Sequence, residues 1–138
     1  ESWVRVDDIR NAFYVRTPYE VDGRSFGIDR WGGKLRFFIY DGGPTAYHIC
    51  EKSWTPSINT WYQVVGVWTN VASNSLALYI NGSLIGSNSH SFTSIKNTTA
   101  PLYLGSFNGG QFSQWLNGRM GRREGSEYNY KEEEGEGW

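Results

Sequence analysis

The sequence predicts an all-β fold, and three observations carry this prediction. The segment 59–86 holds a tryptophan-led apolar run, a polar turn and an alternating run that reverses at Asn81-Gly82. Asn-Gly between alternating apolar runs is the strongest short-range hairpin signal, because both residues tolerate the positive φ of a tight turn. The chain is also rich in turn-forming and aromatic residues, with 17 Gly, 7 Trp, 9 Tyr and 7 Phe. Its apolar residues lack the i, i+3, i+4, i+7 spacing of an amphipathic helix.

The first half of the chain reads as short strands separated by turn signals. The polar residues 7–11 separate two candidate strands, which we expect to be short or at an edge. Gly32-Gly33 then reverses the chain in a second hairpin, whose returning strand carries Leu35, Phe37 and Ile39 on one face. A breaker at residues 41–44 precedes the next alternating run.

The second half contains the best candidate for a core strand. Residues 61–68 carry apolar side chains on both faces, as expected of a strand in the middle of a sandwich. Residues 87–100 read as a long polar connection that Phe92 and Ile95 pin to the sheet edge. The predicted strands are 2–6, 12–16, 25–31, 34–40, 45–51, 61–68, 76–80, 102–107 and 116–120.

Several segments together resemble a known family. The order Trp61-Tyr62, valine-rich strand, then Leu76 to Gly82 resembles the central signature of the laminin G-like, or concanavalin A-like, jelly rolls. Residues 1–5, 101–105 and 115–121 resemble the early, late and penultimate strands of that family. The resemblance implies a two-sheet antiparallel jelly-roll sandwich over residues 1–121. The 138 residues suit one such domain with one core.

The C-terminal segment 122–138, RREGSEYNYKEEEGEGW, departs from this pattern. The family closes with an apolar alternating strand, and only Tyr128-Asn129-Tyr130 resembles it. A buried strand with this many charges would be strongly destabilised, because each unpaired buried charge costs several kcal/mol. Two interpretations stay open: an exposed acidic tail, which we favour, and an atypical closing strand with one wet face.

Charge and hydropathy exclude some partners. The formal net charge of −1 provides no basic surface for nucleic acid. The apolar runs are far shorter than the ~20 residues that cross a bilayer. Cys50 is the single cysteine, so we expect a buried thiol and no internal disulfide. Because the sequence opens at Glu1 without an apolar signal segment, we expect a fragment or processed product of a longer protein.

Catalysis is not expected, although this fold also hosts glycoside hydrolases. Those enzymes need two carboxylates that flank the scissile bond. The resemblance implies the pattern Glu-x-Asp-x-x-Glu, and Glu20 and Asp22 match only its first part, because Arg24 and Ser25 occupy the places that a second glutamate would take. Residues 132–134 are consecutive glutamates, which alternate between the two faces of a strand and cannot converge.

Calcium is the one metal that the resemblance implies, held by oxygen ligands at the rim of the loops. Asp22, Asp29 and Asp41 are weak candidates, because we expect them in or beside turns where hard ligands gather. The alternative for each is a turn cap through side-chain to backbone hydrogen bonds. His48 and His90 are far apart in the sequence and have no carboxylate motif, so we do not expect a zinc site.

A sugar-binding surface needs aromatic faces for the pyranose ring and polar groups for its hydroxyls. We expect the candidates at strand ends and in loops, while Trp3, Trp61 and Trp68 belong to the core. Core packing is the alternative for each candidate tryptophan. The candidate ligand-binding residues are Trp31, Tyr47, Trp54, Asn108, Gln111 and Trp115.

The sequence therefore predicts a non-catalytic carbohydrate-binding or adhesion module of a larger extracellular or virion-surface protein. Its predicted partners are a glycan or neighbouring surface-protein subunits. A structural decoration that contacts sibling subunits through a sheet face or edge strand is the alternative. Asn97, in the sequon Asn97-Thr98-Thr99, is the better of two glycosylation candidates if the protein is secreted by a eukaryote.

Overall fold

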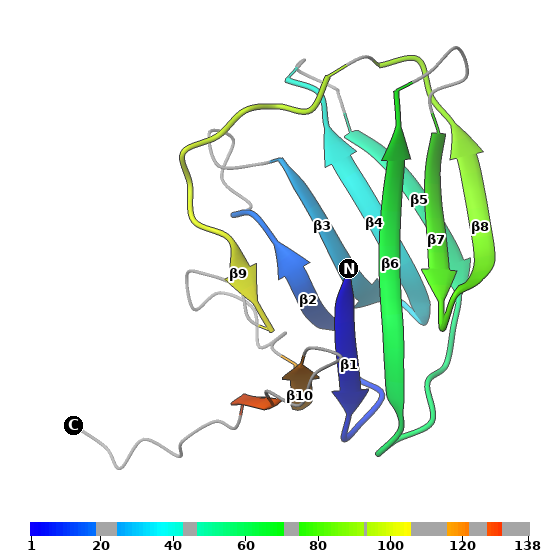
Figure 1. Cartoon of the computed structure of the whole chain (residues 1–138), viewed down its shortest axis with the longest axis vertical. Coiled ribbons are helices and arrows are strands. Elements are labelled where there is room, and N and C mark those ends of the chain that lie inside the picture. Colours follow the sequence, from blue (N-terminus) through cyan, green and yellow to red (C-terminus); the bar gives the residue numbers. More distant parts are fainter. Residues whose placement is uncertain are drawn as a thin grey trace.

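Two antiparallel sheets lie face to face in the computed structural model, which describes residues 1–18, 25–42, 47–70, 75–92, 94–105, 116–121 and 127–130 (Figure 1). The strand order is β11-β10-β1-β6-β7-β8 in the six-stranded sheet and β5-β4-β3-β2-β9 in the five-stranded sheet. The strands are β1 Ser2–Val6, β2 Ala12–Arg16, β3 Phe26–Trp31, β4 Lys34–Tyr40, β5 Tyr47–Ser53, β6 Trp61–Thr69, β7 Ser75–Ile80, β8 Ser83–Ser89, β9 Tyr103–Leu104, β10 Gly118–Gly121 and β11 Glu127–Tyr130. The predicted all-β sandwich is confirmed.

Both predicted hairpins are present. Asn81 and Gly82 join β7 to β8 with φ of 50° and 79°, the left-handed values that a two-residue primed turn requires. Gly32 and Gly33 join β3 to β4 with φ of 57° and 77°. Both turns contain residue types that tolerate positive φ, as a two-residue turn requires. The turn in turn fixes the register of the two strands that it joins.

The core lies between the sheets and follows the period-two alternation of their strands. Val4, Val64 and Leu78 face inward from the six-stranded sheet and are fully buried. Leu35 and Ile39 meet them from the five-stranded sheet and are also fully buried. Burial of a side chain of this size contributes about 1.5–3 kcal/mol, so the inner faces hold the sandwich together.

The predicted place of two tryptophans in the core is wrong. Trp3 and Trp61 are partly exposed and lie outside the core cluster, whereas Val4 and Val64 on the same strands are buried in it. Successive residues of a strand face opposite sides, so only one phase of each strand can reach the core. Trp68 does pack against the core, as expected.

The predicted ends of several strands differ from the observed ones. β5 ends at Ser53, two residues later than predicted, and β8 continues to Ser89 into the segment predicted as a connection. β9 contains only Tyr103 and Leu104. β11 pairs with β10 in the described part of the C-terminal segment, where we favoured an exposed tail.

The connection from β8 to β9 is pinned to the sandwich as predicted. Phe92 is buried and stacks on His48 at 4.2 Å and on Trp68 at 5.6 Å between ring centroids. Further along, the Lys96 backbone N–H donates to the Tyr40 carbonyl. The chain thereby passes from the edge of one sheet to the edge of the other (Figure 1). Among the described residues, no helix has the length and apolar character needed to cross a membrane.

Candidate ligand-binding surface

The outward face of the five-stranded sheet carries a row of aromatic and charged side chains. Leu35, Phe37 and Ile39 of β4 face the core, so the alternate residues of β4 face outward. The register then places Trp31 beside Lys34, Asp29 beside Arg36, and Tyr47 beside Tyr40. We call this surface the outer aromatic face and define it by Trp31, Arg36, Phe38, Tyr40 and Tyr47.

A buried ion pair organises the centre of this face. Arg36 donates from Nε to Asp29 Oδ1 and from Nη2 to Asp29 Oδ2, both at 2.6 Å. The Asp29 side chain is fully buried, and the Arg36 side chain is 19% exposed. Burial raises the pKa of the Asp29 carboxyl, and the hydrogen bonds from Arg36 oppose that rise. The bidentate pair fixes the guanidinium plane, whose carbon lies 5.5 Å from the centre of the Trp31 ring.

An aromatic cluster forms the other part of the face. Phe38 is buried and meets Tyr40 edge-to-face at 6.1 Å between ring centroids. Tyr47 lies 5.9 Å from Phe38 and 5.2 Å from Tyr40. Burial raises the pKa of Tyr47 to about 12, so its hydroxyl is protonated and can donate a hydrogen bond at neutral pH.

The face combines exposed rings with polar groups at its border. Trp31 is 37% exposed and Tyr47 is 42% exposed, whereas Phe38 between them is buried. Lys34 and Glu51 form an exposed ion pair on neighbouring strands. Flat apolar rings flanked by hydrogen-bonding groups suit the alternating apolar and hydroxylated surface of a sugar.

The structure places two of the six candidate ligand-binding residues, Trp31 and Tyr47, on the same face of the sheet. They lie at opposite ends of β4, because Trp31 pairs with Lys34 and Tyr47 pairs with Tyr40. The Trp54 ring does not belong to this face: it meets Tyr62 at 90° with centroids 5.2 Å apart, and it packs against the core. Its environment corresponds to the alternative of core packing. Asn108, Gln111 and Trp115 lie outside the described residues.

The expected position of Asp29 in or beside a turn is wrong, because Asp29 lies inside β3 with both carboxylate oxygens bonded to Arg36. Asp41 does follow a strand, and its Oδ2 lies 2.9 Å from His48 Nε2. Asp22 and Glu20 lie outside the described residues. Within the described ranges, no three His, Cys, Asp or Glu side chains converge in a way that would hold a metal ion.

The structure also brings together a pair that the sequence analysis kept apart. His48 and His90 have ring centroids 5.0 Å apart, and both lie beside Phe92. Burial and the neighbouring His48 lower the pKa of His90. The sequence holds no local signal for this pair, because the contact depends on the path of the β8–β9 connection. Cys50 is buried as expected, and burial raises the pKa of its thiol.

The lowered pKa of His90 predicts that the connection between β8 and β9 is sensitive to acid. In the unfolded chain His90 takes up a proton near its ordinary pKa of about 6.5, before the folded chain does. Stability is therefore full above that pH and falls as the pH drops below it. We expect the urea midpoint to fall more between pH 7.5 and 5.0 in the parent than in His90→Gln. An equal fall in both proteins would contradict the assignment to His90.

Two stacked antiparallel sheets with this strand order define a β-sandwich of the jelly-roll class. The chain belongs to the concanavalin A-like lectin/glucanases superfamily, since a laminin G family model of that description matches residues 1–122. The predicted resemblance is thereby confirmed. Members of this class commonly bind carbohydrates or proteins.

A solved structure agrees with the family assignment. The mouse laminin alpha1 chain, domains LG4-5, is similar with a TM-score of 0.61 and 15% sequence identity. The match covers 86% of this chain and 33% of the laminin chain, so the present chain spans about a third of that structure. At this identity the likeness concerns the fold. A comparison with curated proteins found no match.

Proposed function

We propose that this chain is a non-catalytic carbohydrate-binding or adhesion module of a larger extracellular or virion-surface protein, and that the outer aromatic face holds the ligand. The observation that carries the proposal is that two exposed rings, Trp31 at one end of β4 and Tyr47 at the other, lie on the same face as the ion pair of Lys34 and Glu51. An oligosaccharide along β4 would stack a separate pyranose ring on each aromatic side chain, and its hydroxyls would bond to the neighbouring polar groups.

The charge balance of the face favours a neutral sugar. Arg36 is neutralised by Asp29, and Lys34 is neutralised by Glu51. A third cation, Arg16, lies 5.4 Å from the centre of the Phe38 ring but is only 4% exposed, so it offers little contact to a strongly anionic ligand. Hydroxyl groups, by contrast, can both donate and accept. The described aspartates are engaged, so the proposed mode does not use calcium; calorimetry with calcium and with a chelator tests for a site elsewhere.

We expect Trp31→Ala and Tyr47→Ala each to weaken glycan binding about tenfold, or ~1.4 kcal/mol, because each removes one stacking ring. A broad glycan array identifies the ligand, and calorimetry then measures the affinity of each variant. Tyr79→Ala is the matched control, because Tyr79 is a partly exposed tyrosine of the opposite sheet. Unchanged affinity in both test variants would remove the outer aromatic face from the proposal.

A structural role in a surface assembly is the second candidate, and a separate observation favours it. Leu102 is 50% exposed and Leu104 is 40% exposed beside β9, the edge strand of the five-stranded sheet. Exposed apolar side chains at a sheet edge favour contact with another chain. This candidate would be supported over the first by two results together: no glycan on the array binds, and Leu104→Lys abolishes a contact with another subunit.

A further inference from the structure

β8 forms an open edge of the six-stranded sheet. It pairs with β7 on one side, and no strand among the described residues pairs with its other side. Figure 1 shows β8 at the outside of this sheet, with β5, an edge strand of the opposite sheet, behind it. Charged residues and proline are two devices by which proteins protect an exposed edge, and residues 83–89 contain neither. This edge is therefore a template for a further strand.

The hydrogen bonds of β7 show which of its residues bond to β8. The Asn81 N–H donates to the Gln63 carbonyl, so Asn81 directs its backbone groups toward β6. Successive residues of an antiparallel strand direct their backbone groups to alternate neighbours. Leu78 and Leu76 therefore direct theirs toward β8.

The register then identifies the backbone groups of β8 that face the open side. The partners of these two leucines are Gly86 and Asn88, which therefore bond to β7. Ser87 and Ser89 alternate with them and direct their N–H and C=O groups away from the sheet. The register shift between β7 and β8 precedes this stretch, so residues 86–89 form the regular part of the open edge.

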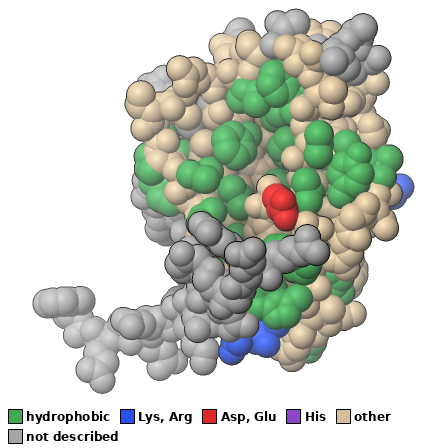
Figure 2. Space-filling view, viewed as in Figure 1, with side chains coloured by type: hydrophobic (Ala, Val, Ile, Leu, Met, Phe, Trp, Pro, Cys, Tyr) green, Lys and Arg blue, Asp and Glu red, His purple; other side chains and the backbone are tan. Residues whose placement is uncertain are grey.

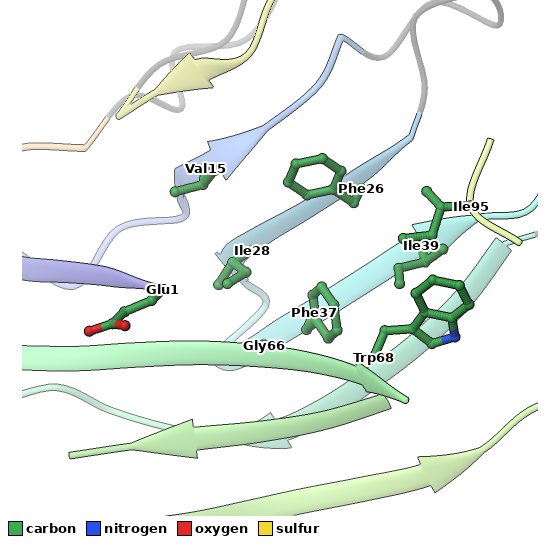
Figure 3. Close-up of a pocket in the computed structure, with 9 residues that line it drawn as sticks. All are labelled: Glu1, Val15, Phe26, Ile28, Phe37, Ile39, Gly66, Trp68 and Ile95. Atoms are coloured by element: carbon green, nitrogen blue, oxygen red, sulfur yellow. The ribbon is translucent and has the colours of Figure 1, made fainter. Parts of the chain in front are cut away.

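The cavity between the sheets lies away from this edge. Its volume is about 220 Å³, and Figure 3 shows its lining side chains around Gly66 of β6. A Cβ on Gly66 would lie 2.6 Å from ring carbons of Phe37, so β6 can carry no side chain at this point. Figure 2 shows hydrophobic side chains gathered around an acidic one on the corresponding face. β8 does not line this cavity, so a strand added to β8 would not fill it.

Behind β8 the sandwich is closed by contact with β5. A Cβ on Gly86 would lie 3.5 Å from Cys50 Sγ and 3.8 Å from Lys52 Cβ, which are ordinary contact distances. Asn88 Nδ2 donates a hydrogen bond of 3.0 Å to the Ile49 carbonyl and so holds the two sheet edges together. An added strand could not insert a side chain into the core here, so its side chains would be recognised by groups at the edge.

Lys52 is an uncompensated cation beside this edge. It is exposed and lies opposite Leu35, whose side chain faces the core, so Lys52 projects between the two sheet edges. No carboxylate among the described residues forms an ion pair with Lys52, whereas Lys34 pairs with Glu51. A residue opposite Gly86 in an added strand would lie on the side of the sheet where Lys52 lies.

We propose that an extended segment of a partner polypeptide pairs with β8, antiparallel to it, and places an acidic side chain opposite Gly86, where it meets Lys52. Main-chain hydrogen bonds to Ser87 and Ser89 would supply affinity, and the acidic side chain would supply specificity. A second copy of β8 would bring its own Lys52 to the same joint, so repulsion between like charges favours a different partner. This interface does not depend on ligand binding at the outer aromatic face.

The probe is the peptide acetyl-Thr-Thr-Val-Glu-Val-amide, whose Glu lies opposite Gly86 when its central Val lies opposite Ser87. Amide hydrogen exchange of the whole chain is followed by NMR with and without millimolar peptide. We expect the Ser87 and Ser89 amides to exchange fast alone and about tenfold more slowly with peptide. The Gly86 and Asn88 amides, which face β7, are internal controls and should exchange at the same rate in both states.

Matched peptides test the acidic side chain. We expect about threefold weaker binding with Gln in place of Glu, because one exposed charge pair is lost. With Lys in that place we expect at least about tenfold weaker binding, because repulsion replaces attraction. In Lys52→Gln the three peptides should bind equally. Arg10→Gln is the matched control, since it removes an exposed cation from the connection between β1 and β2, and it should retain the preference for Glu.

Several results would overturn the proposal. Protection of the Ser87 and Ser89 amides without peptide would show that the edge is already covered. Failure of the Glu peptide to bind, or equal binding of the Glu and Lys peptides to the parent chain, would remove the proposed recognition. A preference for Glu that persists in Lys52→Gln would exclude the role of Lys52. A concentration-dependent dimer that protects the same amides would replace the proposed partner by a second copy of the chain.

Discussion

Arg36→Leu should destabilise the fold by about 3–5 kcal/mol, because it leaves the carboxylate of Asp29 buried without its cation. The Asp29 side chain is fully buried, and each of its carboxylate oxygens accepts a hydrogen bond from Arg36. Without these bonds, the cost of removing the Asp29 carboxylate from water is no longer offset by its nearest cation. Urea unfolding at constant m-value measures the change as a lower midpoint.

Two further variants distinguish the contribution of the buried ion pair to stability from that of surface charge. Lys34→Gln removes the exposed ion pair between Lys34 of β4 and Glu51 of β5, and we expect a cost within about 1 kcal/mol. The double variant Arg36→Leu/Asp29→Val replaces both charges by apolar groups, so it should recover most of the lost stability. If Arg36→Leu costs no more than Lys34→Gln, the ion pair does not organise the outer aromatic face.

Phe38→Ala should cost about 3–5 kcal/mol, although Phe38 lies on the outward face of its sheet. The ring is 3% exposed and covers Gly27, where a Cβ would lie only 2.4 Å from Phe38. It also meets the rings of Tyr40 and Tyr47. The truncation leaves a gap between Gly27 and these tyrosines, which we expect to appear as a lower thermal midpoint and a changed near-ultraviolet circular dichroism.

Tyr47→Ala is the control that distinguishes packing from binding. Tyr47 is 42% exposed on the same face, so its truncation should cost far less stability than that of Phe38 while still weakening glycan binding. Phe38→Leu retains most of the buried volume and should lie between the two. A stable Phe38→Ala with intact binding would show that neither role depends on this ring.

The hairpins and the sandwich were predictable because their signals are local. Positive φ at Asn81 and Gly82 follows from residue type, and the alternation of Leu35, Phe37 and Ile39 assigns one face of β4 to the core. Trp3 and Trp61 were misplaced because their size suggested burial, whereas the phase of each strand decides which residues reach the core. The β11 strand corresponds to the less favoured of the two interpretations of the C-terminal segment, because its charges suggested full solvation.

Two residues of the candidate site could be predicted from their residue type, but the surface that they share could not. Trp31 and Tyr47 were recognisable as exposed aromatics at strand ends, yet their common face depends on the pairing of β4 with both β3 and β5. Asp29 carried the signal of an oxygen ligand, and only the register revealed that Arg36 occupies both of its oxygens. The residue type determines which bonds a side chain can form, and its neighbours determine whether those bonds are already made within the protein.

The sequence by itself determined the all-β class, the two tight turns and the family, because turn conformations and alternation act over a few residues. The tertiary structure alone decided which groups meet across strands: Trp31 with Arg36, His48 with His90, and Gly66 with the cavity behind it. These contacts join residues from different strands and connections. Their distances follow from the register and stacking of sheets, which no local stretch of sequence contains.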